Sequence, residues 1–171
     1  MEEKLRQFLN SKFKDSIIRE DDFRREQSFY IKPESLFPIC EALLENNELD
    51  VKFLKDITAV DWYEHPQAQN GRFEIIYNLY SFSHKYRFFL KVNLPEENPT
   101  ILSLTGLWNG ANWLEREVFD LFGVIFEGHP DLTKILTPDE LEGHPLRRDY
   151  PLTYEKPQFS WNKDKPPEVI K

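Results

Sequence analysis

Three strand-like segments follow one another without an intervening helix, and they constrain the fold more than any other part of the sequence. Residues 57–63 (ITAVDWY), 72–82 (RFEIIYNLYSF) and 86–94 (YRFFLKVNL) are rich in the aromatic and β-branched side chains that strands favour. Turn-forming residues stand at 69–71 (QNG) and 83–84 (SH), between the second segment and its neighbours. The last two segments are therefore expected to pair as a hairpin in a β-sheet.

Helical and extended patterns precede this sheet. Apolar side chains at helical spacing predict an amphipathic helix over residues 2–14. Residues 17–18 and 28–31 are short apolar-rich runs that predict two strands joined by a charged turn. Ser35 is the expected N-cap of a second helix, which carries Pro38 in its first turn and ends near residues 46–47.

The order of the elements predicts the fold class. A helix, two strands, a helix, three or four strands (the fourth over residues 100–104) and a final helix indicate an α+β protein, because a wound α/β fold would alternate strand and helix. We expect a two-layer sandwich of a mixed sheet with helices over residues 1–122. An interface loop region over residues 123–152 would pack on it. Residues 153–171 are proline-rich and predict an extended C-terminal arm.

The final helix carries one misplaced carboxylate. Residues 109–123 (NGANWLEREVFDLFG) predict a helix capped by Asn109 or Asn112 and ended by Gly123, the usual C′ residue. At 100° per residue, Glu115 falls inside the apolar arc of this helix. A carboxylate that faces a core must find a cation or hydrogen-bond donors, or take up a proton.

Two interpretations of Glu115 follow. It could be a general acid or base with a raised pKa, or a structural carboxylate held by an arginine or by backbone N–H groups. The structural interpretation is favoured, because no second catalytic group is near in sequence. Arg116 and Asp120 lie on the polar arc with Glu117, and we expect them at a solvated or partner-facing edge, as an ordinary i,i+4 pair.

The segment after this helix is polar and interrupted by prolines. It contains Gly-His-Pro twice, at residues 128–130 and 143–145, and His129, Asp131, Glu142 and His144 are residue types that bind zinc or iron. They lie on predicted loops without a metal-binding helical spacing, and His-Pro fits turn chemistry equally well. Metal binding is therefore the less favoured interpretation.

Composition excludes several classes of protein. The 171 residues carry a formal net charge of -8 and one cysteine, Cys40. The acidic balance argues against nucleic-acid binding, which depends on cationic side chains. One thiol cannot by itself hold an iron–sulfur cluster. No glycine-rich phosphate-binding motif occurs, and no apolar run approaches the roughly 20 residues of a membrane span. Residues 147–150 (RRDY) concentrate the arginine and tyrosine that are typical of interfaces.

These motifs together resemble a known family. Residues 115–123 (EREVFDLFG), 128–132 (GHPDL) and 143–152 (GHPLRRDYPL), with Ile135-Leu136 and Pro138 between them, resemble the 30 kDa subunit family of respiratory NADH:quinone oxidoreductase (complex I). Residues 56–62 (DITAVDW) fit the same family. One departure is Thr133, where the family usually has a basic residue; Lys134 could substitute for it.

The resemblance implies a subunit rather than an autonomous enzyme. Such subunits belong to the peripheral arm of the proton-translocating complex, at the cytoplasmic face of the membrane, and pack against the hydrogenase-like large subunit near the quinone cavity. Flavin, iron–sulfur clusters and NADH would belong to partner subunits, so no catalytic, cofactor or metal residue is expected here. The resemblance assigns interface or structural ion-pair roles to Glu115, Arg116, Glu117, Asp120, His129, Asp131, Lys134, His144, Arg147, Arg148, Asp149 and Tyr150.

On this basis Glu115 is expected to pair with an arginine and to anchor the helix internally, while the loop presents a surface to the large subunit. Two alternatives remain open at this point. One is a stand-alone metal-dependent hydrolase that uses His129, Asp131, Glu142 and His144. The other is an adaptor of an unrelated complex. The electron donor of the complex could be NADH, reduced ferredoxin or a deazaflavin.

Overall fold

A computed structural model describes residues 1–24 and 26–151 of the chain, so the expected arm over residues 153–171 lies outside the described residues. Five strands form one sheet in the order β1-β2-β5-β4-β3. They comprise β1 (Ile17–Phe23), β2 (Glu26–Ile31), β3 (Phe53–Asp61), β4 (Phe73–Ser81) and β5 (Tyr86–Leu94). Strands β2 and β5 are parallel and the other neighbours are antiparallel, so the sheet is mixed as expected.

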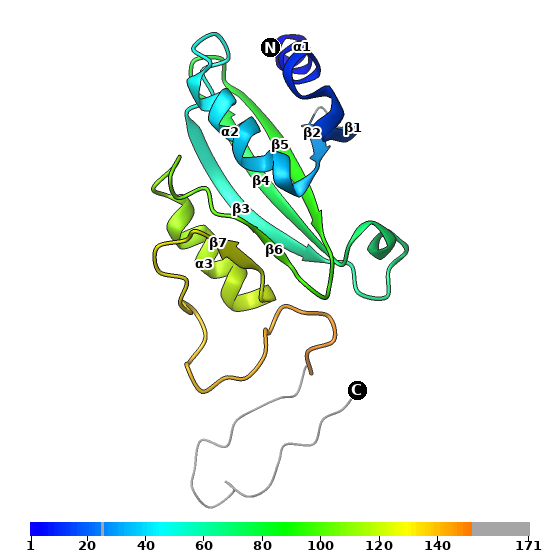
Figure 1. The fold of residues 1–171 in the computed structure, drawn as a ribbon, viewed down its shortest axis with the longest axis vertical. Helices are drawn as coiled ribbons and strands as arrows, with labels where there is room; N and C mark the ends of the chain where they lie inside the picture. The colour runs from blue at the N-terminus through cyan, green and yellow to red at the C-terminus, as the bar shows by residue number, and fades with distance from the viewer. Residues whose placement is uncertain (25, 152–171) are drawn as a thin grey trace, which may run out of the picture.

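The helices complete a two-layer α+β fold, which confirms the predicted class. They are α1 (Glu2–Phe13), α2 (Leu36–Glu45) and α3 (Ala111–Phe122), with short 3-10 turns η1 (Lys14–Ser16), η2 (Pro33–Ser35) and η3 (Pro66–Asn70). In Figure 1, α2 crosses the sheet and α3 lies beside β3, near the two short parallel strands β6 (Thr100–Leu102) and β7 (Ile125–Glu127). Of the described helices, none has the length and apolarity needed to cross a membrane.

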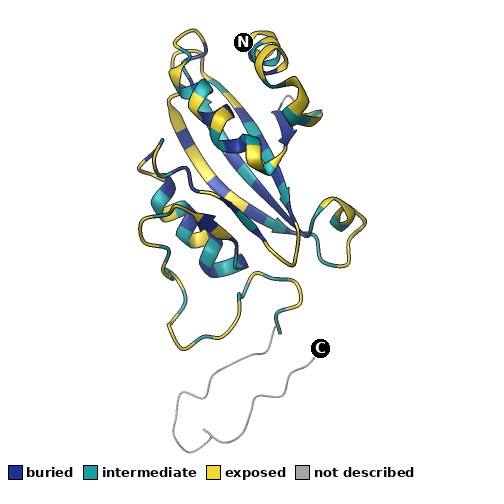
Figure 2. Ribbon diagram, viewed as in Figure 1, coloured by how far each residue is buried: buried dark blue, intermediate teal, exposed yellow. Residues whose placement is uncertain are grey.

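One core joins the helices to the sheet. Alternate residues of β4, such as Ile75, Tyr77 and Leu79, are fully buried, because they face the helices and pack in one cluster with Leu9 of α1 and Val118 of α3. Figure 2 shows this alternation as dark bands along the strands, whereas the loop after β7 is mostly exposed or intermediate. The core therefore holds α3 on its apolar face and leaves the loop to cover part of the other face.

Several element boundaries differ from the prediction. Strand β1 continues through the charged run to Phe23, since an edge strand can keep charged side chains in water. Strand β3 begins at Phe53 rather than at residue 57, because an irregularity between Leu54 and Asp56 interrupts the alternation. Strand β6 ends at residue 102, and strand β7 was not predicted.

Of the two predicted N-caps, that of α2 is confirmed and that of α3 was wrong. Ser35 stands at the N-cap of α2 but makes no side-chain capping hydrogen bond. The N-cap of α3 is Gly110 rather than Asn109 or Asn112, and here too no side chain caps the helix. At the other end of α3 the prediction is confirmed: Gly123 has φ 76° and ψ 27°, the left-handed conformation that glycine adopts at little cost.

Candidate functional site

Glu115 lies on the core side of α3 and its exposed fraction is 0%. Its carboxylate accepts hydrogen bonds from Ser103 Oγ at 2.6 Å and from the Leu104 backbone N–H at 2.7 Å. Within the described chain its hydrogen-bonding partners are these two neutral donors, so the expected arginine partner was wrong. Burial raises the pKa of Glu115 to about 7, because the two donors offset the lost hydration only in part.

Asp120 is buried on the opposite side of α3, under the loop. Its Oδ2 accepts hydrogen bonds from the backbone N–H groups of Ile135 (3.1 Å), Leu136 (2.8 Å) and Thr137 (2.9 Å), and its Oδ1 accepts one from the Thr137 hydroxyl. Burial by itself would raise the pKa of Asp120, but these donors outweigh it and lower the pKa. The expectation that Asp120 lies at a solvated edge was therefore wrong. The periodicity placed it correctly on the polar arc, but it could not show that the loop would cover that arc.

The carbonyl groups at the C-terminal end of α3 receive donors from the same loop. His144 Nδ1 donates to the Asp120 carbonyl at 2.8 Å, the Leu146 N–H to the Leu121 carbonyl at 3.1 Å, and Arg147 Nε to the Phe122 carbonyl at 2.6 Å. A helix leaves its last carbonyls without intrahelical partners, so these bonds satisfy groups that would otherwise need water. A Cβ on Gly123 would collide with the His144 and Arg147 side chains. This collision is a second reason for a glycine at this position, in addition to its left-handed backbone conformation.

Arg116 holds the first part of the loop. Its Nε donates to the Thr133 carbonyl at 3.0 Å, and its Nη2 donates to Thr133 Oγ1 at 2.9 Å and to the Lys134 carbonyl at 3.2 Å. The Lys134 ammonium in turn donates to the Leu141 carbonyl at 2.5 Å. Arg116 thus bonds to the loop and not to Asp120, so the predicted i,i+4 pair was wrong. Thr133 is the position at which the sequence departs from the family pattern, and its hydroxyl accepts a hydrogen bond from Arg116.

The four residues considered for metal binding do not converge. His129 Nε2 donates to the Asn112 carbonyl at 3.1 Å, and its Nδ1 accepts from the Asp131 N–H at 3.0 Å, so both ring nitrogens are used near the start of α3. His144 bonds at the other end of this helix. Over residues 1–24 and 26–151, no three His, Cys, Asp or Glu side chains are grouped as metal ligands. The geometry therefore gives no support to a metal-dependent hydrolase that uses His129, Asp131, Glu142 and His144.

The end of the loop is tied to the sheet through Arg72. Its guanidinium donates to both carboxylate oxygens of Asp61 at 2.9 Å, to Glu96 at 2.6 Å and to Asp149 at 2.6 Å. The backbone N–H of Arg148 also donates to Asp61 at 2.9 Å. The hydrogen bonds to Asp61 above all raise the pKa of Arg72. For Asp61, the donors outweigh its burial and lower the pKa.

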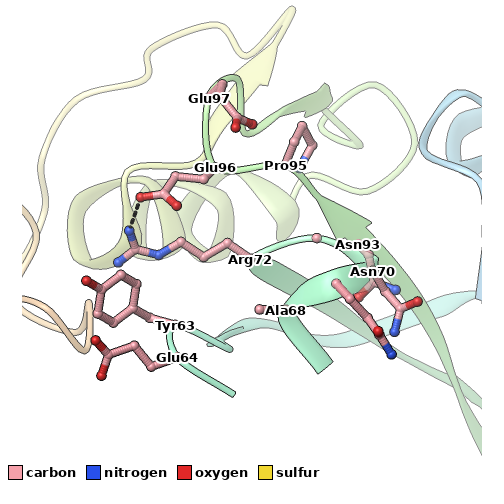
Figure 3. Close-up of a pocket in the computed structure, with 11 residues that line it drawn as sticks. Tyr63, Glu64, Ala68, Asn70, Arg72, Asn93, Pro95, Glu96 and Glu97 are labelled. Atoms are coloured by element: carbon pink, nitrogen blue, oxygen red, sulfur yellow. Dashed lines mark hydrogen bonds and ion pairs between the residues drawn. The ribbon is translucent and has the colours of Figure 1, made fainter. Parts of the chain in front are cut away.

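Figure 3 shows a pocket of about 570 Å³ beside this network. The Tyr63 ring lies against the Arg72 guanidinium at 4.6 Å from the ring centroid, and Glu96 lies on the other side of the guanidinium. Glu64 and Glu97 complete an acidic rim. Every nitrogen of the Arg72 guanidinium donates to a carboxylate, so the pocket offers no unpaired cation from this residue.

The remaining predicted residues lie on the surface of the loop and of α3. Glu117 and Asp131 are exposed, Arg148 contributes its backbone to Asp61, and the Tyr150 ring lies against Gly143. The structure therefore brings nearly all the predicted residues onto one helix and the loop bonded to it. Their roles at an interface remain a prediction.

Sequence reasoning missed Asp61, Arg72 and Glu96. One signal was available for Asp61, which shares the parity of Ile57 and Ala59 and is therefore a carboxylate on the core side of a strand, the same anomaly as Glu115. Arg72 directly follows the turn before β4 and gave no comparable signal. Its partner Asp149 is 77 residues away in the sequence.

The fold and the site define a two-layer α+β domain whose last helix and following loop form one hydrogen-bonded unit, here called the α3–loop unit (residues 111–151). The family described as "Respiratory-chain NADH dehydrogenase, 30 Kd subunit" matches residues 29–156. The chain belongs to this family, and it is a subunit of the oxidoreductase complex that the family serves.

Individual relatives agree with this assignment. The chain is 43% identical over 157 residues to the NADH-quinone oxidoreductase C subunit of Roseiflexus sp. (strain RS-1), covering 92% of this chain and 88% of the relative. It is 49% identical over 117 residues to NADH-quinone oxidoreductase subunit 5 of Thermus thermophilus, covering 66% of this chain and 56% of that one. A solved structure titled as the trypsin-resistant fragment (1-134) of Nqo5 aligns with a TM-score of 0.64 at 33% identity, over 75% of this chain and 99% of that chain.

Proposed function

We propose that this chain is a cofactor-free subunit of the peripheral arm of proton-translocating NADH:quinone oxidoreductase, with a structural and assembly role. In this role it packs against the hydrogenase-like large subunit near the quinone cavity. The observation that carries the proposal is the α3–loop unit, in which Asp120, His144 and Arg147 fix an otherwise irregular segment on a helix. A surface prepared in this way loses little conformational entropy on binding.

The single thiol supports the cofactor-free part of the proposal. Cys40 is completely buried in α2, and burial raises the pKa of its thiol well above the ordinary value. A thiol ligates metal as the thiolate, so this residue is a poor ligand. Flavin and iron–sulfur clusters would then belong to partner subunits, and the chain would reach the cytoplasmic face of the membrane through those partners.

The twelve family residues divide by position in this proposal. One group holds the α3–loop unit together or ties it to the sheet: Glu115, Arg116, Asp120, His129, Lys134, His144, Arg147 and Asp149. The others shape its outer surface toward the partner: Glu117, Asp131, Arg148 and Tyr150.

Purification of the complex through a tag on this chain tests the proposal. We expect the tagged chain to co-purify with the large subunit and to cross-link to it directly, while the isolated full-length chain contains no iron or flavin. Arg147→Ala should reduce the amount of assembled complex and leave the quinone reductase turnover per assembled complex unchanged. Full assembly of this variant with lost turnover, or iron and flavin in the isolated chain, would contradict the proposal.

A further inference from the structure

Large apolar side chains are exposed on the α3–loop unit and on its neighbouring strand. Of the nine large hydrophobic residues that are exposed in the described chain, five belong to residues 100–151: Leu102, Trp113, Ile125, Leu136 and Leu146. Trp113 is the largest of them and is 60% exposed. Exposed tryptophan is costly in water and is enriched among the residues that dominate binding energy at interfaces.

We propose that Trp113 is the anchor through which α3 enters an apolar recess on a neighbouring subunit of the complex, and that Glu117 pairs there with a lysine or arginine of that subunit. The inference rests on the proposed function and adds the contact that determines docking. It commits to a partner with an apolar recess flanked by a cation.

Arg116 and the loop support the Trp113 ring. The Arg116 guanidinium lies 5.1 Å from the centre of the indole ring, within the range of a cation–π contact. The same guanidinium is held by the Thr133 and Lys134 carbonyls and the Thr133 hydroxyl. The indole therefore rests on a side chain that the loop has already fixed, and it can enter a recess without first ordering its surroundings.

Glu117 supplies the charge on the same face. It follows Trp113 by one helical turn, so the two side chains are neighbours on the surface of α3. Glu117 is exposed and makes no hydrogen bond or ion pair with any residue of the described chain. Arg116, the nearest cation in sequence, is bonded to the loop instead. An unpaired carboxylate beside an apolar anchor is complementary to a partner cation.

Leu136 extends the apolar part of this face. It is 61% exposed, and its backbone N–H donates to the carboxylate of Asp120. Asp120 lies on α3, seven residues after Trp113. Seven residues correspond to about 10 Å along a helix, so both side chains can contact one partner surface. The exposed rings of Phe53 and Phe82 differ in this respect, because they contact each other with their centroids 5.1 Å apart.

Competition between the Trp113→Ala chain and the wild-type chain for incorporation into the complex in cells tests the anchor. A tagged Trp113→Ala chain and the untagged wild-type chain are expressed together, and quantitative mass spectrometry compares their ratio in the complex with their ratio in the free pool. We expect the variant to be depleted in the complex by roughly tenfold or more. Phe82→Ala is the matched control, because Phe82 is 65% exposed outside the α3–loop unit, and it should enter the complex as well as wild type. Equal incorporation of Trp113→Ala would overturn the inference.

A photo-cross-linking residue in place of Trp113 identifies the partner. We expect one subunit to be labelled at an apolar segment close to a lysine or arginine. Glu117→Lys should reduce incorporation, and reversal of the charge of that partner residue should restore it. Labelling of no subunit would overturn the inference, and so would an unchanged yield of Glu117→Lys. If the wild-type tagged chain brings down no other subunit, the proposed function itself fails. The thermal melting of full-length Trp113→Ala should match wild type, because the indole is exposed, which separates docking from folding.

Discussion

Replacement of Glu115 by glutamine should remove a dependence of stability on pH. The folded pKa of Glu115 is about 7, whereas the ordinary value is 4.5. The folded protein therefore binds this proton more tightly than the unfolded chain does. The stabilising effect of the bound proton is complete below about pH 4.5, and it is lost as the pH rises through 7.

The magnitude follows from the two pKa values. At 1.36 kcal/mol per pKa unit, the full loss is about 3 kcal/mol. Between pH 5 and pH 8 the free energy of unfolding should fall by about 2.5 kcal/mol through this group. The amide that Glu115→Gln introduces can accept the Leu104 N–H and donate to Ser103 Oγ, as the protonated Glu115 side chain would. The variant should therefore be close to wild type at pH 5 and clearly more stable at pH 8.

Urea unfolding of the full-length chain at a series of pH values measures this difference. Glu117→Gln is the matched control, because it makes the same chemical change at an exposed position two residues further along α3. The difference in free energy between Glu117→Gln and wild type should not vary across this range. The free energy of unfolding of Glu115→Gln, plotted against pH, could run parallel to that of wild type. In that case Glu115 does not carry a raised pKa, and the argument from its burial is refuted.

Two further changes test the ties between the loop and the rest of the domain. Asp120→Ala should lower the free energy of unfolding by about 3 kcal/mol, because it leaves the backbone N–H groups of residues 135–137 without their acceptor; hydrogen exchange at residues 135–137 should accelerate, and unchanged exchange would contradict this. Arg72→Met should cost about 3–5 kcal/mol because it leaves Asp61 buried and unpaired, and Asp61→Asn in the same chain should recover part of the loss in a double-mutant cycle.

Local patterns predicted the parts of the fold that are decided by local contacts. The hairpin of β4 and β5, the apolar face of α3 and its end at Gly123 all follow from periodicity and turn chemistry within a single hairpin or a single helix. The parallel pairing of β2 with β5 was not specified, because it joins segments about 60 residues apart through side chains that resemble those of any buried strand. The family resemblance selected the residues of the α3–loop unit, but it could not provide their partners.

The errors at the site have a common physical cause. A helical wheel assigns each residue either to the core or to solvent. It cannot predict that a later segment of the chain will cover the polar face of the helix. Asp120 was therefore placed in water, although the loop supplies four donors to it. Glu115 was correctly placed in the core, but an arginine was expected where a hydroxyl and one backbone N–H are sufficient. The number of hydrogen-bond donors around a carboxylate depends on loop geometry, and the hydrophobic periodicity of a helix gives no information about that geometry.

The two buried carboxylates of α3 respond to pH in opposite ways. Glu115 has two donors and a raised pKa, so a rise in pH toward 8 leaves a buried charge that these donors offset only in part. Asp120 has four donors and a lowered pKa, so its attachment of the loop is complete above the ordinary pKa of an aspartate and is lost only in stronger acid. Within the neutral range, the pH dependence of stability at α3 should therefore come from Glu115 on the core side and not from the bonds between Asp120 and the loop.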